Sequence, residues 1–368
     1  MIGLQSARFA ILFSFLTYAG SLFAQTPSQT PSIEAFYKDR QVSLIITGSP
    51  GSIYDMYART LSYAMAKRIP GEPTIVPRSM VGGGHLVGAN YLYNVAPQDG
   101  SVIGSIGETM PLVQLLEPDQ VKFDVSRFNW IGNPNVANLT LTVWSGKGFD
   151  TLQDAMTKTV IIGASGATSP SSTTPTLLNN ILGAKFKVIN GFPANQLDMA
   201  MERGEIDGRG SAQWEWWKIS RPQWIKEKKI TILMQMGPRK EPDLPDVPLL
   251  NDLARTTEER QVFALYSSTV VVGRPLLMPP NVPVERVAVW RKAFFDTVND
   301  PAFLAEAKKM KLPINPIFGE EMQRAITEIA LTPKHVIDLS KAALEGRPVY
   351  ECVQAGSDLQ TCIGSAKK

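Results

Sequence analysis

Residues 42–55 read VSLIITGSPGSIYD, and this stretch decides how the rest of the chain is interpreted. Its apolar start, from Val42 to Thr47, is typical of a strand that is buried on both faces of a parallel sheet. Gly, Ser and Pro dominate the following residues, and a helical pattern begins with Tyr54 and Asp55. A strand, loop and helix in this order form the repeating unit of doubly wound α/β folds. The loop also gathers backbone N–H groups at a helix start, an arrangement that suits an anion.

The alternation of apolar strands, small-residue loops and helices continues along the chain. Further strands are predicted at residues 73–77, 101–105, 139–144, 160–164, 186–189 and 230–235, and helices at about 54–68, 85–94, 175–182, 195–203, 284–299, 301–310 and 320–344. An apolar, β-branched run from Thr269 to Val272 enters Pro275 to Pro283 and looks like a crossing that returns from one lobe to another. These patterns predict doubly wound α/β units, and 368 residues are enough for two domains.

The charge balance argues against nucleic acid as a partner. The chain has 37 basic and 34 acidic residues, a formal net charge of +3, and no run that concentrates the basic ones. Binding to nucleic acid requires a clustered patch of Lys and Arg. The hydrophobic fraction of 44% and the charged fraction of 19% are those of a soluble globular protein.

The N-terminus has the pattern of a secretory signal peptide. Arg8 precedes the apolar run FAILFSFLTYAGSLFA, residues 9–24, and a polar stretch follows. A membrane anchor requires about 20 apolar residues, more than this run offers, and no Cys follows it that could carry a lipid. We therefore expect residues 1–24 to be removed after Ala24, the mature protein to be periplasmic, and residues 25–34 to form a linker without secondary structure.

Cysteine and histidine are scarce. Cys352 and Cys362 are the only cysteines and lie close together in a polar tail, residues 346–368. In an oxidising compartment such a pair favours a disulfide; the alternative is two unrelated thiols in a loose tail. With His85 and His335 as the only histidines, we expect no metal site and no metal cofactor.

Three loops rich in small residues follow predicted strands, at residues 48–53, 81–85 and 165–169. None has the Walker pattern, the G-x-G-x-x-G pattern or the G-x-S-x-G pattern of a nucleophile elbow. Gly, Ser and Thr do let the main chain approach a charged ligand, so that backbone N–H groups hold an anion without a cationic side chain. Phosphate and carboxylate are equally compatible with such loops.

Two other classes of function stay open at this point. One is an exported serine hydrolase of the α/β type that uses Ser165 or Ser52 as its nucleophile, although neither histidine lies in a recognisable partner context. The other is a structural or adhesive protein. Turnover of an ester would distinguish the hydrolase from a binding protein.

A specific resemblance comes from the order of several short motifs, of which no single one is decisive. In chain order they are D-R-x-V-x-L-I-I, Y-D-x-x-A-R, V-P-R-S-M-V-G-G-G-H-L-V-G-A-N, A-P-Q-D-G, R-G-E-I-D-G, L-P-D-V-P-L-L, P-P-N-V-P-V-E-R-V-A-V-W-R-K-A-F and D-P-A-F. The chain thereby resembles the Bug family, the TctC-like extracytoplasmic solute receptors of tripartite tricarboxylate transporters. The similarity runs from about Arg40 to Leu344.

The resemblance implies a two-lobed periplasmic binding protein of type II that is not an enzyme and needs no cofactor. Residues 35–136 and 268–345 would form lobe 1 and residues 137–267 lobe 2, with a small carboxylate held between lobes that close on it. The expected partners are integral membrane transporter subunits or a sensor, and the expected state is a monomer. Mono- and dicarboxylates, aliphatic and aromatic, remain open as ligands.

The resemblance also assigns ligand contacts to the three loops. Backbone N–H groups of the first loop would bind a carboxylate, the glycine loop would hold bridging waters, and the third loop would bind an anion from lobe 2. The loop residues concerned are Ser49, Pro50, Gly51, Ser52, Ile53, Tyr54, Gly82, Gly83, Gly84, Ser165, Gly166, Ala167, Thr168 and Ser169. The third loop lacks the histidine that many members have near its end.

Two further candidates are features of this sequence. Arg209 follows an Asp-Gly turn and either pairs with a distal carboxylate of the ligand or pairs with Glu205 at the surface. Of Trp214, Trp216 and Trp217, one is expected to face the cleft while the others pack inside the lobe. We take Trp214 as the cleft residue.

Overall fold

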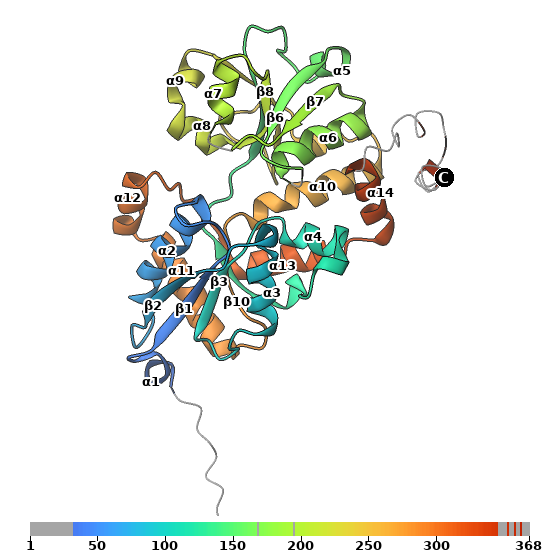
Figure 1. Cartoon of the computed structure of the whole chain (residues 1–368). Coiled ribbons are helices and arrows are strands. Elements are labelled where there is room, and N and C mark those ends of the chain that lie inside the picture. The colour runs from blue at the N-terminus through green and yellow to red at the C-terminus, as the bar shows by residue number, and fades with distance from the viewer. Residues whose placement is uncertain are drawn as a thin grey trace, which may run out of the picture.

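The computed structural model describes residues 32–167, 169–193 and 196–344, together with residues 352, 357, 361 and 362. The predicted signal peptide and most of the predicted linker lie outside these residues. The described chain forms two lobes, one above the other in Figure 1, each built on a β-sheet covered by helices. This confirms the predicted two-lobed α/β architecture. None of the helices in the described residues has the length and apolarity that a membrane crossing requires.

Lobe 1 contains a six-stranded sheet in the order β11-β4-β10-β3-β1-β2. Its strands are β1 (Gln41–Ile46), β2 (Thr74–Ser79), β3 (Val102–Ser105), β4 (Asn129–Asn133), β10 (Leu276–Met278) and β11 (Ile317–Phe318). Its helices are α1 (Ile33–Tyr37), α2 (Ile53–Ala66), α3 (Leu86–Asn94), α4 (Met110–Leu116), α11 (Val284–Val298), α12 (Pro301–Lys309) and α13 (Gly319–Ala330).

Strand β1 is buried on both faces, as its continuous apolar run predicts. Leu44 and Ile46 pack with Leu61 of α2 and Trp290 of α11 on one side of the sheet. Ile45 points to the other side, into the core that α3, α4 and α13 cover. β1 pairs in parallel with β2 and β3, so the loops after these strands lie at one edge of the sheet.

Lobe 2 contains a five-stranded sheet in the order β7-β6-β8-β5-β9. Its strands are β5 (Leu139–Trp144), β6 (Val160–Ala164), β7 (Phe186–Asn190), β8 (Gly208–Gln213) and β9 (Ile230–Met236), and its helices are α5 (Asp154–Thr157), α6 (Pro170–Leu182), α7 (Leu197–Glu202), α8 (Trp214–Ser220) and α9 (Pro222–Lys226). Helix α6 approaches β8 so closely that a Cβ atom at Gly210 would lie 1.9 Å from the Ser171 carbonyl oxygen. Only glycine fits this position.

The structure corrects two features of the predicted element map. The run from Thr269 to Val272 is not a crossing strand, because it ends helix α10 (Thr257–Val272). The helix predicted over residues 320–344 is two helices, α13 and α14 (Lys334–Leu344), which are separated at Pro333. Proline lacks the N–H that would continue the first helix, and its ring disfavours a helical residue before it.

The two lobes are connected where β4 leads to β5 and where α10 leads to β10. The side chain of Asn133, at the end of β4, links these two connections. Its Nδ2 donates to the Val271 carbonyl oxygen at 3.0 Å, and its Oδ1 accepts from the Asn135 and Arg274 N–H groups, each at 3.1 Å. The amide lies so close to Gly273, which has φ +54°, that a Cβ there would be 2.3 Å from Asn133 Nδ2.

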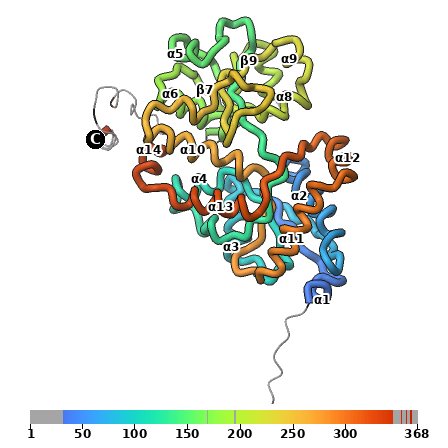
Figure 2. The backbone as a smooth tube through the Cα atoms, turned by 180° about the vertical axis from the view of Figure 1, so that it is seen from behind, coloured from blue at the N-terminus to red at the C-terminus, as the bar shows by residue number. Residues whose placement is uncertain are grey.

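Helix α14 also spans the two lobes, because it packs against α6 of lobe 2 and α4 of lobe 1 (Figure 2). Beyond it, Cys352 and Cys362 are joined by a disulfide. Cys362 is buried in the same apolar cluster as Leu339 of α14.

Candidate functional site

The loop between β1 and α2 begins the site. Ser52 caps α2 through its hydroxyl, which accepts from the Asp55 N–H at 3.4 Å. The Asp55 carboxylate is buried, accepts the Gly51 N–H at 3.0 Å and pairs with Arg59 at 2.7 Å. One N–H group of the expected carboxylate loop is therefore already bonded to a carboxylate of the chain itself.

Gly51 lies at the exposed tip of this loop with φ +76°, and a Cβ there would meet nothing within 4 Å. The glycine is required by its backbone conformation and not by crowding. A β-branched substitution such as Gly51→Val therefore strains the empty protein as well as any complex.

The glycine loop leads to His85, a residue that the sequence does not single out as a ligand contact. Gly82, Gly83, Gly84 and His85 all have positive φ values. The Thr47 hydroxyl donates to the Ser105 carbonyl oxygen at 3.0 Å and therefore accepts from His85 Nδ1 at 2.7 Å. Burial lowers the pKa of His85, so its ring is neutral, with the proton on Nδ1 and a lone pair on Nε2.

Tyr54 and Glu108 form the centre of the cluster in lobe 1. The Tyr54 hydroxyl donates to Glu108, and the Tyr54 ring centroid lies 5.1 Å from that of His85. Burial raises the pKa of Glu108, while the nearby charge of Arg274 acts in the opposite direction. The sequence does not single out Glu108 either, since nothing local marks it as close to Tyr54.

Arg274 supplies a cation at the connection between the lobes. Its guanidinium carbon is 5.9 Å from the centroid of the Tyr54 ring. Its Nε is buried without a hydrogen-bond partner, and no ion pair involves Arg274 within the described part of the chain. A partly buried guanidinium of this kind is suited to an anionic ligand.

In lobe 2, the loop after β6 is organised by its own hydroxyl groups. The Ser165 N–H donates to Ser171 Oγ at 3.1 Å, and the Ser169 hydroxyl donates to the Gly166 carbonyl oxygen at 2.7 Å. Ser165 and Ala167 are exposed, whereas Thr168 lies outside the described residues. Ala167 and Thr109, the residue after Glu108, line one cavity between the lobes, so the two loop regions face each other across it.

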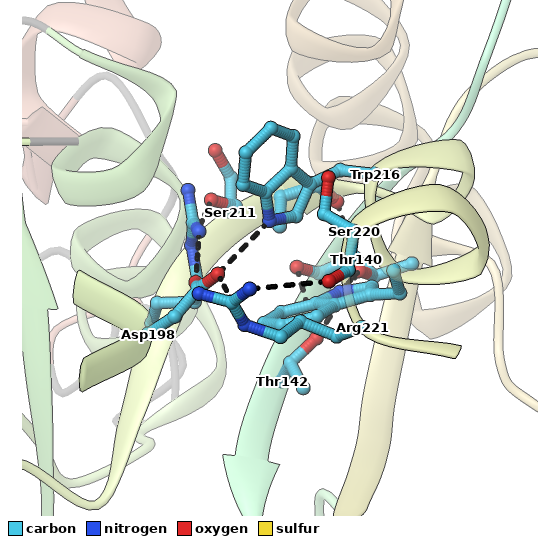
Figure 3. A network of polar contacts seen from close by, with 10 residues as sticks. Thr140, Thr142, Asp198, Ser211, Trp216, Ser220 and Arg221 are labelled. Atoms are coloured by element: carbon cyan, nitrogen blue, oxygen red, sulfur yellow. Dashed lines mark hydrogen bonds and ion pairs between the residues drawn. The ribbon is translucent and has the colours of Figure 1, made fainter. Parts of the chain in front are cut away.

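Arg209 is neither free to pair with a ligand carboxylate nor paired with Glu205 at the surface, the two alternatives that the sequence offers. Its Nη1 donates to Asp198 Oδ1 at 2.6 Å and its Nε to the Ser211 carbonyl oxygen at 3.1 Å, and the guanidinium is buried. Asp198 also accepts from Trp216 Nε1 at 3.1 Å and pairs with Arg221 at 3.3 Å (Figure 3).

Because Asp198 neutralises Arg209 inside lobe 2, this guanidinium has no free charge to offer a distal carboxylate of a ligand. Glu205, the other partner considered, pairs with Arg203 instead.

The three tryptophans divide as expected, but the exposed one is not Trp214. Trp214 is buried, with Nε1 donating to Asp243 at 3.1 Å, and Trp217 is buried, with Nε1 donating to Thr140 Oγ1 at 3.0 Å. Trp216 is 40% exposed. It follows β8 at the same edge of the sheet as the loop after β6, since β6 and β8 are parallel, and it is the most exposed of the three tryptophans.

The site offers charge and hydrogen bonds but no arrangement for nucleophilic catalysis. Among the described residues no cluster of His, Cys, Asp and Glu could hold a metal ion. His85 Nδ1 is hydrogen-bonded to Thr47. The Ser52 hydroxyl accepts from the Asp55 N–H, and the Ser165 hydroxyl is hydrogen-bonded to the Ser171 hydroxyl, so neither serine is hydrogen-bonded to His85. The alternative of an exported serine hydrolase therefore gains no support.

The architecture is shared with periplasmic binding proteins of known structure. A TctC solute-binding protein from Polaromonas matches with a TM-score of 0.64 at 18% identity, over 82% of this chain and 99% of the other. The periplasmic binding protein BugD matches with a TM-score of 0.58 at 17% identity, over 83% and 98%. MatC from Rhodopseudomonas palustris, with bound malate, matches with a TM-score of 0.55 at 17% identity, over 83% and 99%. No protein-family model and no curated protein matches the sequence.

These matches confirm the fold expected from the resemblance, that of a two-lobed periplasmic binding protein.

Proposed function

We propose that this protein is an exported receptor that binds a small organic acid between its two lobes and delivers it to a membrane transporter or sensor. The observation that carries the proposal is Arg274, a guanidinium at the connection between the lobes with a buried Nε that lacks a partner. The fold is that of TctC and BugD, and MatC, which shares it, was solved with malate. The signal-peptide pattern of residues 1–24 supports periplasmic location.

In this proposal the acid's carboxylate pairs with Arg274 beside Tyr54. Backbone N–H groups of the loop over residues 48–54 and of the loop after β6 donate further hydrogen bonds to it. Charge-assisted hydrogen bonds each contribute about 1.5–3 kcal/mol, so a few of them reach micromolar affinity, about −8 kcal/mol. The two lobes would close around the ligand by rotation at their connections. No chemical step is involved, and no cofactor is needed.

A thermal-shift screen of mono- and dicarboxylates against the mature protein tests the proposal. A ligand that binds only the folded state stabilises it by RT ln(1 + [L]/Kd), about 2.7 kcal/mol at 100 times Kd. We expect at least one acid to raise the melting temperature by several degrees, and the amide of the same acid to have no effect. Equal shifts with acid and amide would argue against carboxylate recognition.

We expect acid binding to become tighter as the pH falls towards the pKa of Glu108. Burial raises that pKa, and a negative Glu108 next to Arg274 repels an arriving carboxylate. Protonation of Glu108 removes this repulsion, so binding takes up a proton. Glu108→Gln should flatten this pH dependence and, at a pH where Glu108 is ionised, tighten binding by about tenfold, or about 1.4 kcal/mol.

Calorimetry in two buffers of different ionisation enthalpy measures the proton uptake. Glu285→Gln, at an exposed position of α11, serves as the matched control and should leave the pH profile unchanged. If Glu108→Gln abolished binding instead, Glu108 would accept a hydrogen bond from the ligand, and the ligand would carry a donor group next to its carboxylate.

A further inference from the structure

A mainly apolar cavity, open on one side, lies between the lobes beside the loop after β6. Its lining comes mainly from helix α4 of lobe 1, helix α6 of lobe 2 and the two spanning helices α10 and α14. Figures 1 and 2 show these helices next to one another where the lobes meet. Its volume is about 360 Å³, and its apolar lining comes from Leu112, Val113, Leu116, Met236 and Leu344. Since both lobes contribute walls, the cavity exists in this form only while the lobes keep this relation to each other.

The lining of the cavity also contains hydroxyl groups, among them those of Tyr266, Thr269 and Thr176. The Tyr266 hydroxyl of α10 is buried and makes no hydrogen bond, although Tyr266 lines the cavity. Two other hydroxyls of the lining are used within their own helices: Thr269 donates to the Tyr266 carbonyl oxygen at 2.8 Å, and Thr176 to the Ser172 carbonyl oxygen at 2.8 Å. The cavity therefore offers a ligand mainly apolar contacts.

The cavity connects to the proposed carboxylate site at its edge. Thr109, which lines it, is the neighbour of Glu108, and Ala167, which also lines it, belongs to the loop over residues 165–169. A ligand whose carboxylate lies near Arg274 and Glu108 can thus direct its remaining atoms past Thr109 and Ala167, between α4 and α6.

We propose that this cavity holds the apolar body of the ligand, so that the receptor selects monocarboxylic acids with a long hydrocarbon or aryl body over compact, polar diacids. This inference rests on the proposed function. At about 30 Å³ for each non-hydrogen atom, taken from the volume of water in the liquid, the cavity accommodates roughly 12 such atoms.

Calorimetry with straight-chain monocarboxylates of increasing length tests the inference on the intact mature protein. Each methylene group that enters an apolar cavity should tighten binding by about fourfold, until the cavity is full near ten carbons.

Two variants reduce the cavity from opposite lobes. Val113→Trp on α4 should shorten the preferred chain and weaken binding of the ten-carbon acid at least tenfold, with the four-carbon acid nearly unchanged. Thr173→Leu on α6 provides a second, smaller filling if Val113→Trp does not fold. Val95→Trp, at a position of lobe 1 that is 67% exposed, is the matched control and should alter neither acid.

The outcomes separate this inference from the proposed function. Binding of compact diacids such as malate, with no gain from chain length and no effect of Val113→Trp, would overturn the inference and leave the receptor function intact. Failure of every acid to bind would contradict the proposed function itself. Binding of a long alcohol as tightly as the matching acid would show an apolar site that is independent of carboxylate recognition, which also overturns the inference.

Discussion

Arg274→Met is expected to weaken binding of every carboxylate ligand by about 100-fold, equivalent to about 2.7 kcal/mol. A guanidinium and a carboxylate form paired, charge-assisted hydrogen bonds, and methionine retains only the apolar length of the side chain. The empty protein should lose little stability, because the Nε of Arg274 is buried without a hydrogen-bond partner. Its main-chain N–H, which donates to Asn133, is kept.

The measurement is calorimetry with the tightest acid from the ligand screen. Arg274→Lys retains the positive charge but not the forked geometry, so it should give an intermediate affinity. Arg324→Met removes the same charge from an exposed position of α13 and controls for the overall charge of the protein. An affinity within threefold of the unaltered protein for Arg274→Met would move the carboxylate away from the lobe connection.

Asp198→Ala is expected to lower the free energy of unfolding of lobe 2 by about 3–5 kcal/mol. Asp198 is 1% exposed and is the acceptor for Arg209, Arg221 and Trp216. Alanine leaves Arg209 buried with its charge uncompensated, and burial lowers the pKa of Arg209. The remaining bond to the Ser211 carbonyl oxygen carries no opposite charge.

Urea unfolding followed by tryptophan fluorescence reports this loss, since the tryptophans of α8 are next to Asp198. Glu205→Ala, which removes the exposed pair with Arg203, should leave the unfolding midpoint nearly unchanged. The double variant Asp198→Leu with Arg209→Met replaces both charges by apolar groups and should recover most of the stability. A double variant as unstable as Asp198→Ala would mean that packing, and not the unpaired charge, causes the loss.

Strands with a strong local signal could be predicted from the sequence, whereas strands held by tertiary contacts could not. The sequences of β1, β5 and β6 are rich in apolar and β-branched residues, because each strand is buried on both faces of its sheet, and this local pattern is enough to predict them. Strand β8 reads Gly-Arg-Gly-Ser-Ala-Gln and has no apolar run. It is buried because Gly210 permits close contact with α6, a fact that only the folded neighbour reveals.

The same distinction applies to the site. Loops of small residues after strands are local features, so the loops over residues 48–54, 82–84 and 165–169 could be predicted as candidates. Glu108 and Arg274 are 166 positions apart in the numbering of the chain and meet only because β10 lies next to β3 in the sheet. For Arg209, the sequence offers Glu205 as the near neighbour, but β8 and α7 bring Asp198 to it instead.

The Asn133 side chain has a mechanical consequence for the whole molecule. Because the Asn133 amide bonds to Asn135 in one connection and to Val271 and Arg274 in the other, it ties the two connections to each other, and we expect the lobes to turn about this point. Opening then changes mainly the angle between the lobes. Distances between the lobes close to Asn133 change little, whereas distances between the lobes far from Asn133 grow in proportion to how far they lie from it. A membrane partner that rests on both lobes would have a single angle by which to distinguish the loaded receptor from the empty one.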